Sequence, residues 1–504
     1  MHPHTLFPPA SRGQRRWISC SSEGVFEPVA TYGWVIILSE DRRKVKNLVI
    51  VGRELGKTPY LRGDPIFGSA RAFRDDPLDF IESARRKHGD FVRIRLGPYR
   101  VYLLLGPEHV RHLLQKNPGN YLKDGYEHNE PLTGSGLLTS EGDFWRRQRR
   151  LTQPAFHKER LRGMVGTMTD ATEEMLGRWR DHLGNGGRRP LEIDAEMSRL
   201  TLSIVSRTLM GTDVSGGASE VGRSLEYTLW YAFRRTGRFF NPPFGFPTPK
   251  NLRYMRAIRT LETLVYSLID GRRESDEVGA DLLSMLVQAR DSETGEGVGR
   301  RQLRDEVITF LAAGYETTAR ALAWTFYLLD RNPEERRKLR EELAQVLGGR
   351  APTYEDLPQL VYTKMFVEES MRLYPPVWGL ARRAKGEDEI EGHRVPKGSR
   401  LIISSYVTHR HPAFWENPEK FEPEHFTPER SKGRPRYAYF PFGGGPRQCI
   451  GINFAMMEAT LIIAMVAQRF DLSLVPSHPV EPQANLTLIP RYGLPMVPSG
   501  VAIG

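Results

Sequence analysis

Cysteine and long apolar runs are both scarce in this chain of 504 residues. It has two cysteines, Cys20 and Cys449, too few for a disulfide framework, so we expect a cytoplasmic protein. They are also too few for a four-cysteine zinc or iron–sulfur site. The most apolar stretch near the N-terminus, residues 25–38, includes Glu27 and Pro28. A membrane-spanning helix needs about 20 apolar residues, so we expect no transmembrane segment.

The charge balance is positive, with 72 Lys and Arg against 61 Asp and Glu, a net charge of +11. Such an excess is compatible with nucleic acid, an acidic membrane surface or an acidic protein partner. No nucleic-acid-binding motif accompanies it, and we expect no nucleic-acid partner. The composition, 39% hydrophobic and 26% charged, is typical of a globular protein.

The pattern predicts two regions along the chain. Residues 1–57 are irregular and read as a poorly ordered N-terminal extension, with a mitochondrial-type presequence as the alternative. Residues 58–504 contain no linker or repeat and are predicted to form a single domain rich in helices. Within it we expect a hairpin over 91–105, a long buried helix over 302–330, and a last hairpin made of 483–488 and 494–497.

The segment Phe442-Gly-Gly-Gly-Pro-Arg-Gln-Cys-Ile-Gly451 places Cys449 between a glycine-rich loop and the start of a helix. A lone cysteine is usually a small buried apolar residue. Here, however, several amide N–H groups and the positive end of the helix can converge on the sulfur. Both favour thiolate, which is the form that ligates metals. Arg447 can face an anionic group on the same ligand, and Phe442 offers a flat apolar surface.

This segment, with the spacing F-x-x-G-x-R-x-C-x-G, resembles the cytochrome P450 superfamily. The resemblance implies a mainly α fold with a small β lobe, and a haem b whose iron is bound by Cys449. It also implies that Phe442, Arg447 and Gly451 belong to the cofactor site.

A second motif, Ala313-Gly-Tyr-Glu-Thr-Thr318, lies in the long predicted helix. By itself it is explained equally well by a pair of helical threonines beside a solvated glutamate. It resembles the family's A-G-x-[DE]-T-[TS] segment, which implies that Thr317 and Glu316 deliver protons to bound dioxygen. Gly314 would let a flat macrocycle approach the helix beside Ala313, and the Thr317 hydroxyl can bond the Ala313 carbonyl.

Three further segments resemble family motifs. Glu369 and Arg372, on one helix face, match a buried structural pair. The segment 421–426 matches the F-x-P-E-R-F loop, except that His425 replaces the usual arginine, which leaves the third member of the triad uncertain. Trp145 and Arg149 match a site for a haem propionate.

Arg382 matches a further arginine at the propionates, with Arg383 as an adjacent alternative. Aromatic side chains crowd residues 227–246, including Phe239 and Phe240. They either line an apolar substrate site or simply pack a lid.

The resemblance implies a monooxygenase that inserts one atom of dioxygen into an apolar substrate, such as a fatty acid, a terpenoid or another secondary metabolite. Its electrons would come ultimately from NAD(P)H through a ferredoxin or flavodoxin. Four cations, Arg430, Lys432, Arg434 and Arg436, could dock such an acidic partner. The alternatives are a haem-thiolate sensor or carrier, and a peroxide-driven hydroxylase.

Overall fold

The computed structural model describes residues 34–35, 51–52 and 58–501, apart from 127, 185–188, 215–219, 237–240, 275–278, 280 and 292. The chain divides into residues 1–57 and residues 58–504. In the first unit, the strands β1 (Trp34–Val35) and β2 (Val51–Gly52) form an antiparallel pair. The predicted disorder of this unit, Cys20, Phe239 and Phe240 all lie outside the described residues.

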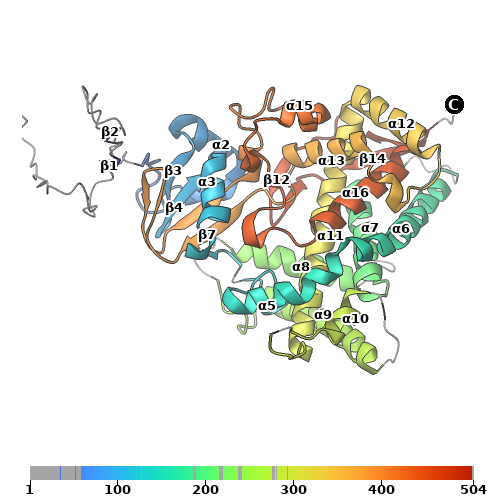
Figure 1. The fold of residues 1–504 in the computed structure, drawn as a ribbon, viewed down its shortest axis with the longest axis horizontal. Helices are drawn as coiled ribbons and strands as arrows, with labels where there is room; N and C mark the ends of the chain where they lie inside the picture. Colours follow the sequence, from blue (N-terminus) through green and yellow to red (C-terminus); the bar gives the residue numbers. More distant parts are fainter. Residues whose placement is uncertain are drawn as a thin grey trace, which may run out of the picture. The chain divides into compact units, whose positions relative to one another are not determined.

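Helices make up most of the second unit, as the sequence predicts (Figure 1). They are α1 (Ala70–Asp75), α2 (Pro77–His88), α3 (Pro107–Arg111), α4 (Glu130–Thr133), α5 (Gly142–Thr152), α6 (Lys158–Gly184), α7 (Ile193–Met210), α8 (Glu220–Arg235), α9 (Pro249–Glu274), α10 (Leu282–Gln288), α11 (Arg300–Arg331), α12 (Pro333–Leu347), α13 (Val361–Leu373), α14 (Ser405–Thr408), α15 (Pro428–Ser431) and α16 (Ile452–Ala467).

The strands form small sheets. They are β3 (Phe91–Leu96), β4 (Tyr99–Leu104), β5 (Tyr121–Lys123), β6 (Leu191–Glu192), β7 (Leu380–Ala384), β8 (Asp388–Ile390), β9 (His393–Val395), β10 (Arg400–Ile403), β11 (Phe470–Leu474), β12 (Pro482–Ala484), β13 (Leu488–Pro490) and β14 (Pro495–Gly500). The largest sheet has the order β3-β4-β10-β7-β5, and only its β4–β10 pair is parallel.

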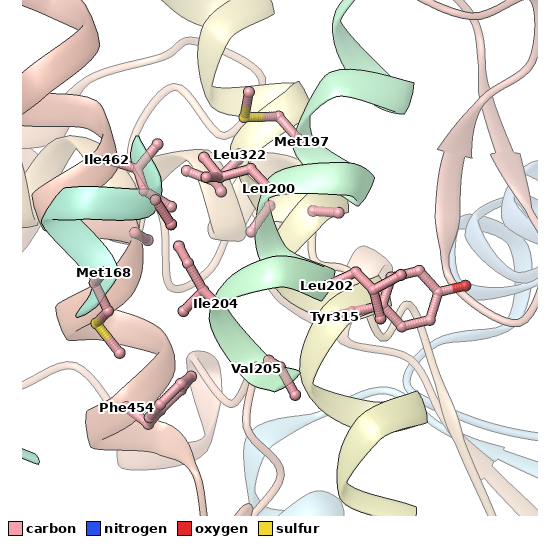
Figure 2. Packing of buried hydrophobic residues seen from close by; sticks show 14 of the residues in the cluster. Met168, Met197, Leu200, Leu202, Ile204, Val205, Tyr315, Leu322, Phe454 and Ile462 are labelled. Atoms are coloured by element: carbon pink, nitrogen blue, oxygen red, sulfur yellow. The ribbon is translucent and has the colours of Figure 1, made fainter. Parts of the chain in front are cut away.

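The long helix α11 organises the core. It spans 32 residues, or about 48 Å, and it packs along α7 and against α13 and α16. Figure 2 shows side chains of four helices meeting in this core, among them Met168, Leu200, Leu322 and Ile462. Most residues of α11 are buried, as the sequence predicts for a long helix whose central segment is largely apolar.

The hairpin predicted over 91–105 is confirmed as β3 and β4. The predicted last hairpin is wrong in its pairing. β12 pairs with β13 through the short turn at 485–487, whereas β14 pairs with β11 and β6. Residues 488–490 therefore close a local hairpin, and 495–500 joins a sheet whose partners lie far away in sequence.

No helix in the described part of the chain combines the length and the apolar character that crossing a membrane requires.

Candidate functional site

The loop before α16 presents Cys449 to an accessible space. The Cys449 amide donates to the Phe442 carbonyl at 3.0 Å, which closes the loop. Gly445 has a φ of 63°, and a Cβ there would lie 1.8 Å from the Leu114 carbonyl oxygen, so only glycine fits. Cys449 is exposed although the helix that follows is largely buried. The loop therefore leaves the sulfur free to bind a ligand.

The protein around the loop opposes ionisation of the thiol. Although the sulfur itself is accessible, desolvation by the surrounding protein atoms raises the pKa of Cys449, and the Gly451 amide and the Arg149 charge offset this only in part. Arg149 donates to the Gln448 carbonyl at 2.8 Å, so its charge serves the loop backbone as well. The amide and charge contributions expected of the loop act in the expected direction, but desolvation outweighs them. A bound metal ion deprotonates a thiol outright, and a metal would have to supply that stabilisation here.

A cluster of cations lies on the β5–β7 edge of the large sheet and on the cysteine loop. Lys123 and Arg382 are direct cross-strand partners, and like charges so placed are destabilising. Lys123 donates to the carbonyls of Leu137, at 3.3 Å, and Leu138. Arg447 pairs with Glu141, and Arg382 donates to its neighbouring Ala381 carbonyl.

The electrostatics of this cluster suit an anionic ligand. Burial, and next the charge of Arg447, lower the pKa of Lys123 to about 7. Burial also lowers the pKa of Arg447, to about 10, and the pKa of Arg382. Three cations share one carboxylate, Glu141, among the described residues, which leaves two positive charges uncompensated. Because buried charges need partners, the cluster fits a ligand that carries two carboxylates.

Trp145 completes the cluster. The Arg447 guanidinium carbon lies 3.8 Å from the centroid of its ring. Trp145 is 9% exposed, and its indole N–H has no hydrogen-bond acceptor in the described part of the chain. Arg149 instead bonds Gln448 and the Gln153 side chain. Trp145 is therefore available to an anion together with Arg447, while Arg149 acts mainly on the cysteine loop.

On the β7 strand the structure separates the two candidate arginines. Arg382 is 7% exposed and belongs to the cluster. Arg383 points to solvent. The buried residue is thus the one placed for an anionic ligand.

The middle of α11 faces the same kind of accessible space. Ala313 is exposed although Leu311 and Ala312 beside it are buried. The Thr317 hydroxyl donates to the Ala313 carbonyl at 2.7 Å, as the sequence predicts. A Cβ at Gly314 would lie 2.9 Å from the Val205 side chain of α7. The glycine therefore also serves the close packing of α7 on α11, while Ala313 is the exposed residue beside it.

Glu316 is partly buried, and its carboxylate contacts Thr487. Its Oε1 accepts a hydrogen bond from the Thr487 hydroxyl at 2.9 Å, and the nearby Arg320 pairs with Asp194. Burial raises the pKa of Glu316, and the Arg320 charge partly opposes this. No hydrogen bond joins Glu316 to Thr317, since consecutive helix residues project about 100° apart. Any proton route between them needs an intermediate group.

The triad beneath the site is complete, with His425 in the third position. Arg372 and Glu369, both 0% exposed, form two hydrogen bonds of 2.7 Å. His425 Nδ1 lies 3.0 Å from Glu369, and its Nε2 donates to the Glu416 carbonyl at 2.8 Å. The remaining Arg372 donors reach backbone carbonyls, including that of Pro418. His425 therefore contacts Glu369, which the replacement of the usual arginine by histidine had left uncertain.

The sequence analysis did not identify three further candidate residues, Lys123, Glu141 and Glu458. Lys123 and Glu141 lie near the cysteine loop only through the β5–β7 pairing and the turn before α5, so neither had a local motif. Glu458, on α16, is 0% exposed. Burial raises its pKa well above the usual value, and the Thr318 hydroxyl offsets this in part. An acidic residue in an apolar helix was the available signal for Glu458.

Two of the four cations proposed to dock a partner already form contacts within the protein. Arg430 pairs with Glu416 and Glu422. Arg434 lies 3.8 Å over the Trp415 ring and donates to the His425 carbonyl. Lys432 and Arg436 remain exposed and define a smaller basic patch than the sequence suggests.

The aromatic segment 227–246 packs largely against itself and α9. Tyr227 and Tyr231 stack at 5.9 Å, and Phe244 and Tyr254 at 4.9 Å. The Tyr231 hydroxyl also donates to the Asn251 side chain at 2.7 Å. Lid packing accounts for these side chains.

A helical fold with an exposed cysteine loop, a cluster of cations suited to a ligand with two carboxylates, and an exposed Ala313 on an otherwise largely buried helix defines a haem-thiolate class of protein. The sequence profile described as cytochrome P450 matches residues 59–497. The chain belongs to the cytochrome P450 family and is one of its haem-iron monooxygenases.

Individual proteins are similar to this chain over most of its length. The chain is 38% identical to cyclooctatin synthase of Streptomyces melanosporofaciens, covering 84% of this chain and 92% of that protein. It is 35% identical to pentalenene oxygenase of Streptomyces avermitilis, covering 84% and 93%. A crystal structure of the cytochrome P450DA heme domain superposes with a TM-score of 0.80 at 27% identity, covering 88% of this chain and 98% of that one.

The residues fit a haem b. Cys449 offers a free sulfur, the cluster of Lys123, Arg382 and Arg447 has two uncompensated charges for two propionates, and Ala313 gives a flat ring access to α11.

Proposed function

We propose that this chain hydroxylates a terpenoid, using dioxygen and electrons delivered from NAD(P)H by a separate ferredoxin or flavodoxin, in the cytoplasm. The observation that carries the substrate class is the similarity, at 35–38% identity over more than four-fifths of the chain, to proteins that act on terpenoids. An apolar substrate also agrees with the apolar α11 surface around the exposed Ala313.

Each site residue has a role in this proposal. Cys449 holds the iron, while Trp145, Arg382, Arg447 and Lys123 hold the propionates. When bound, the haem supplies dioxygen activation at its iron, and electron donation from a cysteine thiolate favours O–O cleavage.

Protons for the reaction would come from the α11 side of the site. Thr317 holds a hydroxyl at the Ala313 carbonyl and can pass a proton toward the space that Ala313 faces. Desolvation raises the pKa of both Glu316 and Glu458, which favours the protonated acid and makes both side chains candidates for proton donation.

Isotope labelling tests the proposal. The purified protein would be combined with a ferredoxin, its reductase, NADPH and ¹⁸O₂, and offered a panel of cyclic terpenes and, for comparison, fatty acids. We expect a terpenoid product that carries one ¹⁸O atom and forms only with NADPH. Product formed only with added hydrogen peroxide would identify a peroxide-driven hydroxylase, and tight substrate binding without turnover would identify a carrier.

A further inference from the structure

The turn between β12 and β13 brings a buried hydroxyl to the acid of α11. Thr487, in this turn, is 3% exposed, and its Oγ1 donates a hydrogen bond to Glu316 Oε1 at 2.9 Å. The two residues are 171 positions apart in the chain, and they meet because β13 packs against α11. Thr487 belongs to no sequence motif, so only the fold reveals this contact.

Two tryptophan side chains fix this turn, one on each side of the threonine. The Trp378 indole N–H donates to the Asn485 carbonyl at 2.8 Å, and the Trp324 indole N–H donates to the Leu488 carbonyl, also at 2.8 Å. The Leu488 amide in turn donates to the Pro376 carbonyl at 2.9 Å. Because these bonds hold the backbone before and after the threonine, its hydroxyl has one fixed place against the carboxyl group on α11.

The Glu316 carboxyl depends on this one hydroxyl for its direction. Within the described ranges, Thr487 is its only hydrogen-bond donor. The charged and titratable groups that act on it are Arg320 and Tyr315 on α11, Asp194 on α7 and Glu226 on α8. Arg320, the one cation among them, forms its ion pair with Asp194. The hydrogen bond from the turn is therefore the contact that orients the acid.

The same hydrogen bond opposes the effect of desolvation on the acid. Desolvation raises the pKa of Glu316, and the Arg320 charge and the Thr487 hydroxyl both lower it. A hydroxyl that donates to a carboxyl group stabilises the ionised form more than the neutral form. A general acid transfers its proton less readily as its acidity falls. Without this hydroxyl, Glu316 would be a weaker acid and its carboxyl group would be free to turn.

We propose that Thr487 is a positioning residue for the reaction: its hydroxyl orients the Glu316 carboxyl and keeps this group acidic enough to donate a proton. This inference rests on the proposed function, in which Glu316 is a proton donor. The alternative is that the hydroxyl only ties the β12–β13 turn to α11. Removing it would then loosen the turn whatever residue occupies position 316, and the two explanations therefore predict different results when both positions are changed.

An infrared pH titration of the full-length, haem-loaded protein tests the contact without turnover. A protonated carboxyl group has its own infrared band, and the band that is lost in Glu316→Gln belongs to Glu316. In Thr487→Val the midpoint of this band should be about one pH unit higher than in the natural protein, since the ionised form loses a hydrogen bond. Thr487→Ser retains the hydroxyl and should restore the natural midpoint.

The pH profile of product formation supplies the second measurement, with a ferredoxin, its reductase and NADPH. In Thr487→Val the highest rate should fall about threefold, and the alkaline limb should move upward together with the infrared midpoint. In a Glu316→Gln background the same substitution should change neither. Thr172→Val is the matched control, because the Thr172 hydroxyl is also buried and donates to the Met168 carbonyl of its own helix at 2.7 Å. It should leave midpoint and profile unchanged.

Three results would overturn the proposal. The first is an unchanged infrared midpoint in Thr487→Val, which would show that the hydroxyl does not act on the acid. The second is a loss of rate that persists in the Glu316→Gln background, which would assign Thr487 to support of the turn. The third is an equal change in Thr172→Val, which would make the effect common to any lost buried hydroxyl. The infrared titration needs no substrate, so it decides the contact even if the proposed function fails.

Discussion

Replacing Glu306 by glutamine tests how α11 holds the loop that carries part of the haem site. Glu306 is 0% exposed on α11. Its Oε2 accepts from the Leu137 amide at 3.0 Å, and its Oε1 accepts from the Gln302 side chain at 2.8 Å. The Leu137 carbonyl in turn accepts from Lys123. The contact therefore links α11 to the cation cluster.

The expected change in the free energy of unfolding follows from the pKa of Glu306. Burial raises it from 4.5 to about 7, against smaller lowering contributions from the Leu137 amide and Gln302. The folded state thus holds this proton more tightly than the unfolded state. The corresponding stability is fully present below about pH 4.5 and is lost as pH rises to about 7. A shift of this size is worth about 3 kcal/mol.

Glu306→Gln keeps an oxygen for the Leu137 amide and cannot ionise. At pH 8 the variant should have a higher free energy of unfolding than the natural protein, by up to about 3 kcal/mol. The difference should shrink toward zero near pH 4.5. Urea unfolding at a series of pH values measures it, with the exposed Glu389→Gln as control. A difference that does not change between pH 5 and 8 would refute the reasoning.

Three further outcomes are expected. Thr317→Ala should keep consuming reductant but yield less product per electron pair and release hydrogen peroxide, whereas Thr317→Ser should couple normally; full coupling in the alanine variant would exclude the hydroxyl. Arg372→Leu removes the two guanidinium hydrogen bonds of the buried Glu369 and leaves it only His425 and a backbone amide. Unfolding should become easier by about 3–5 kcal/mol with loss of haem content, and an unchanged denaturation midpoint would contradict the role of the pair. Deleting residues 1–57 should leave haem content and substrate binding nearly unchanged, as absorbance titrations can check; loss of haem-loaded protein would show that the extension packs on the domain.

Local patterns were enough to predict the parts of the fold that depend on local sequence. The period of α11, the β3–β4 hairpin and the start of α16 after Cys449 all follow from apolar spacing and turn residues. The pairing of β14 with β11 could not be read in this way, because strand partners distant in sequence are chosen by the whole fold.

The candidate site likewise has residues that local sequence predicts and residues that it does not. Cys449 and the Thr317–Ala313 hydrogen bond depend on contiguous motifs, and both could be predicted. Lys123 could not, because its contact with Arg382 exists only through strand pairing. The packing role of Gly314 could not be predicted either, because the sequence does not reveal that Val205 of α7 lies against it.

The ferrous–CO difference spectrum of the purified protein tests the central claim most directly. We predict the red-shifted Soret band of a thiolate-ligated haem in the natural protein and in Cys20→Ala, and its loss in Cys449→Ala, because Cys449 alone of the two cysteines lies on the loop beside the cation cluster. A red-shifted band that persists in Cys449→Ala would contradict the account.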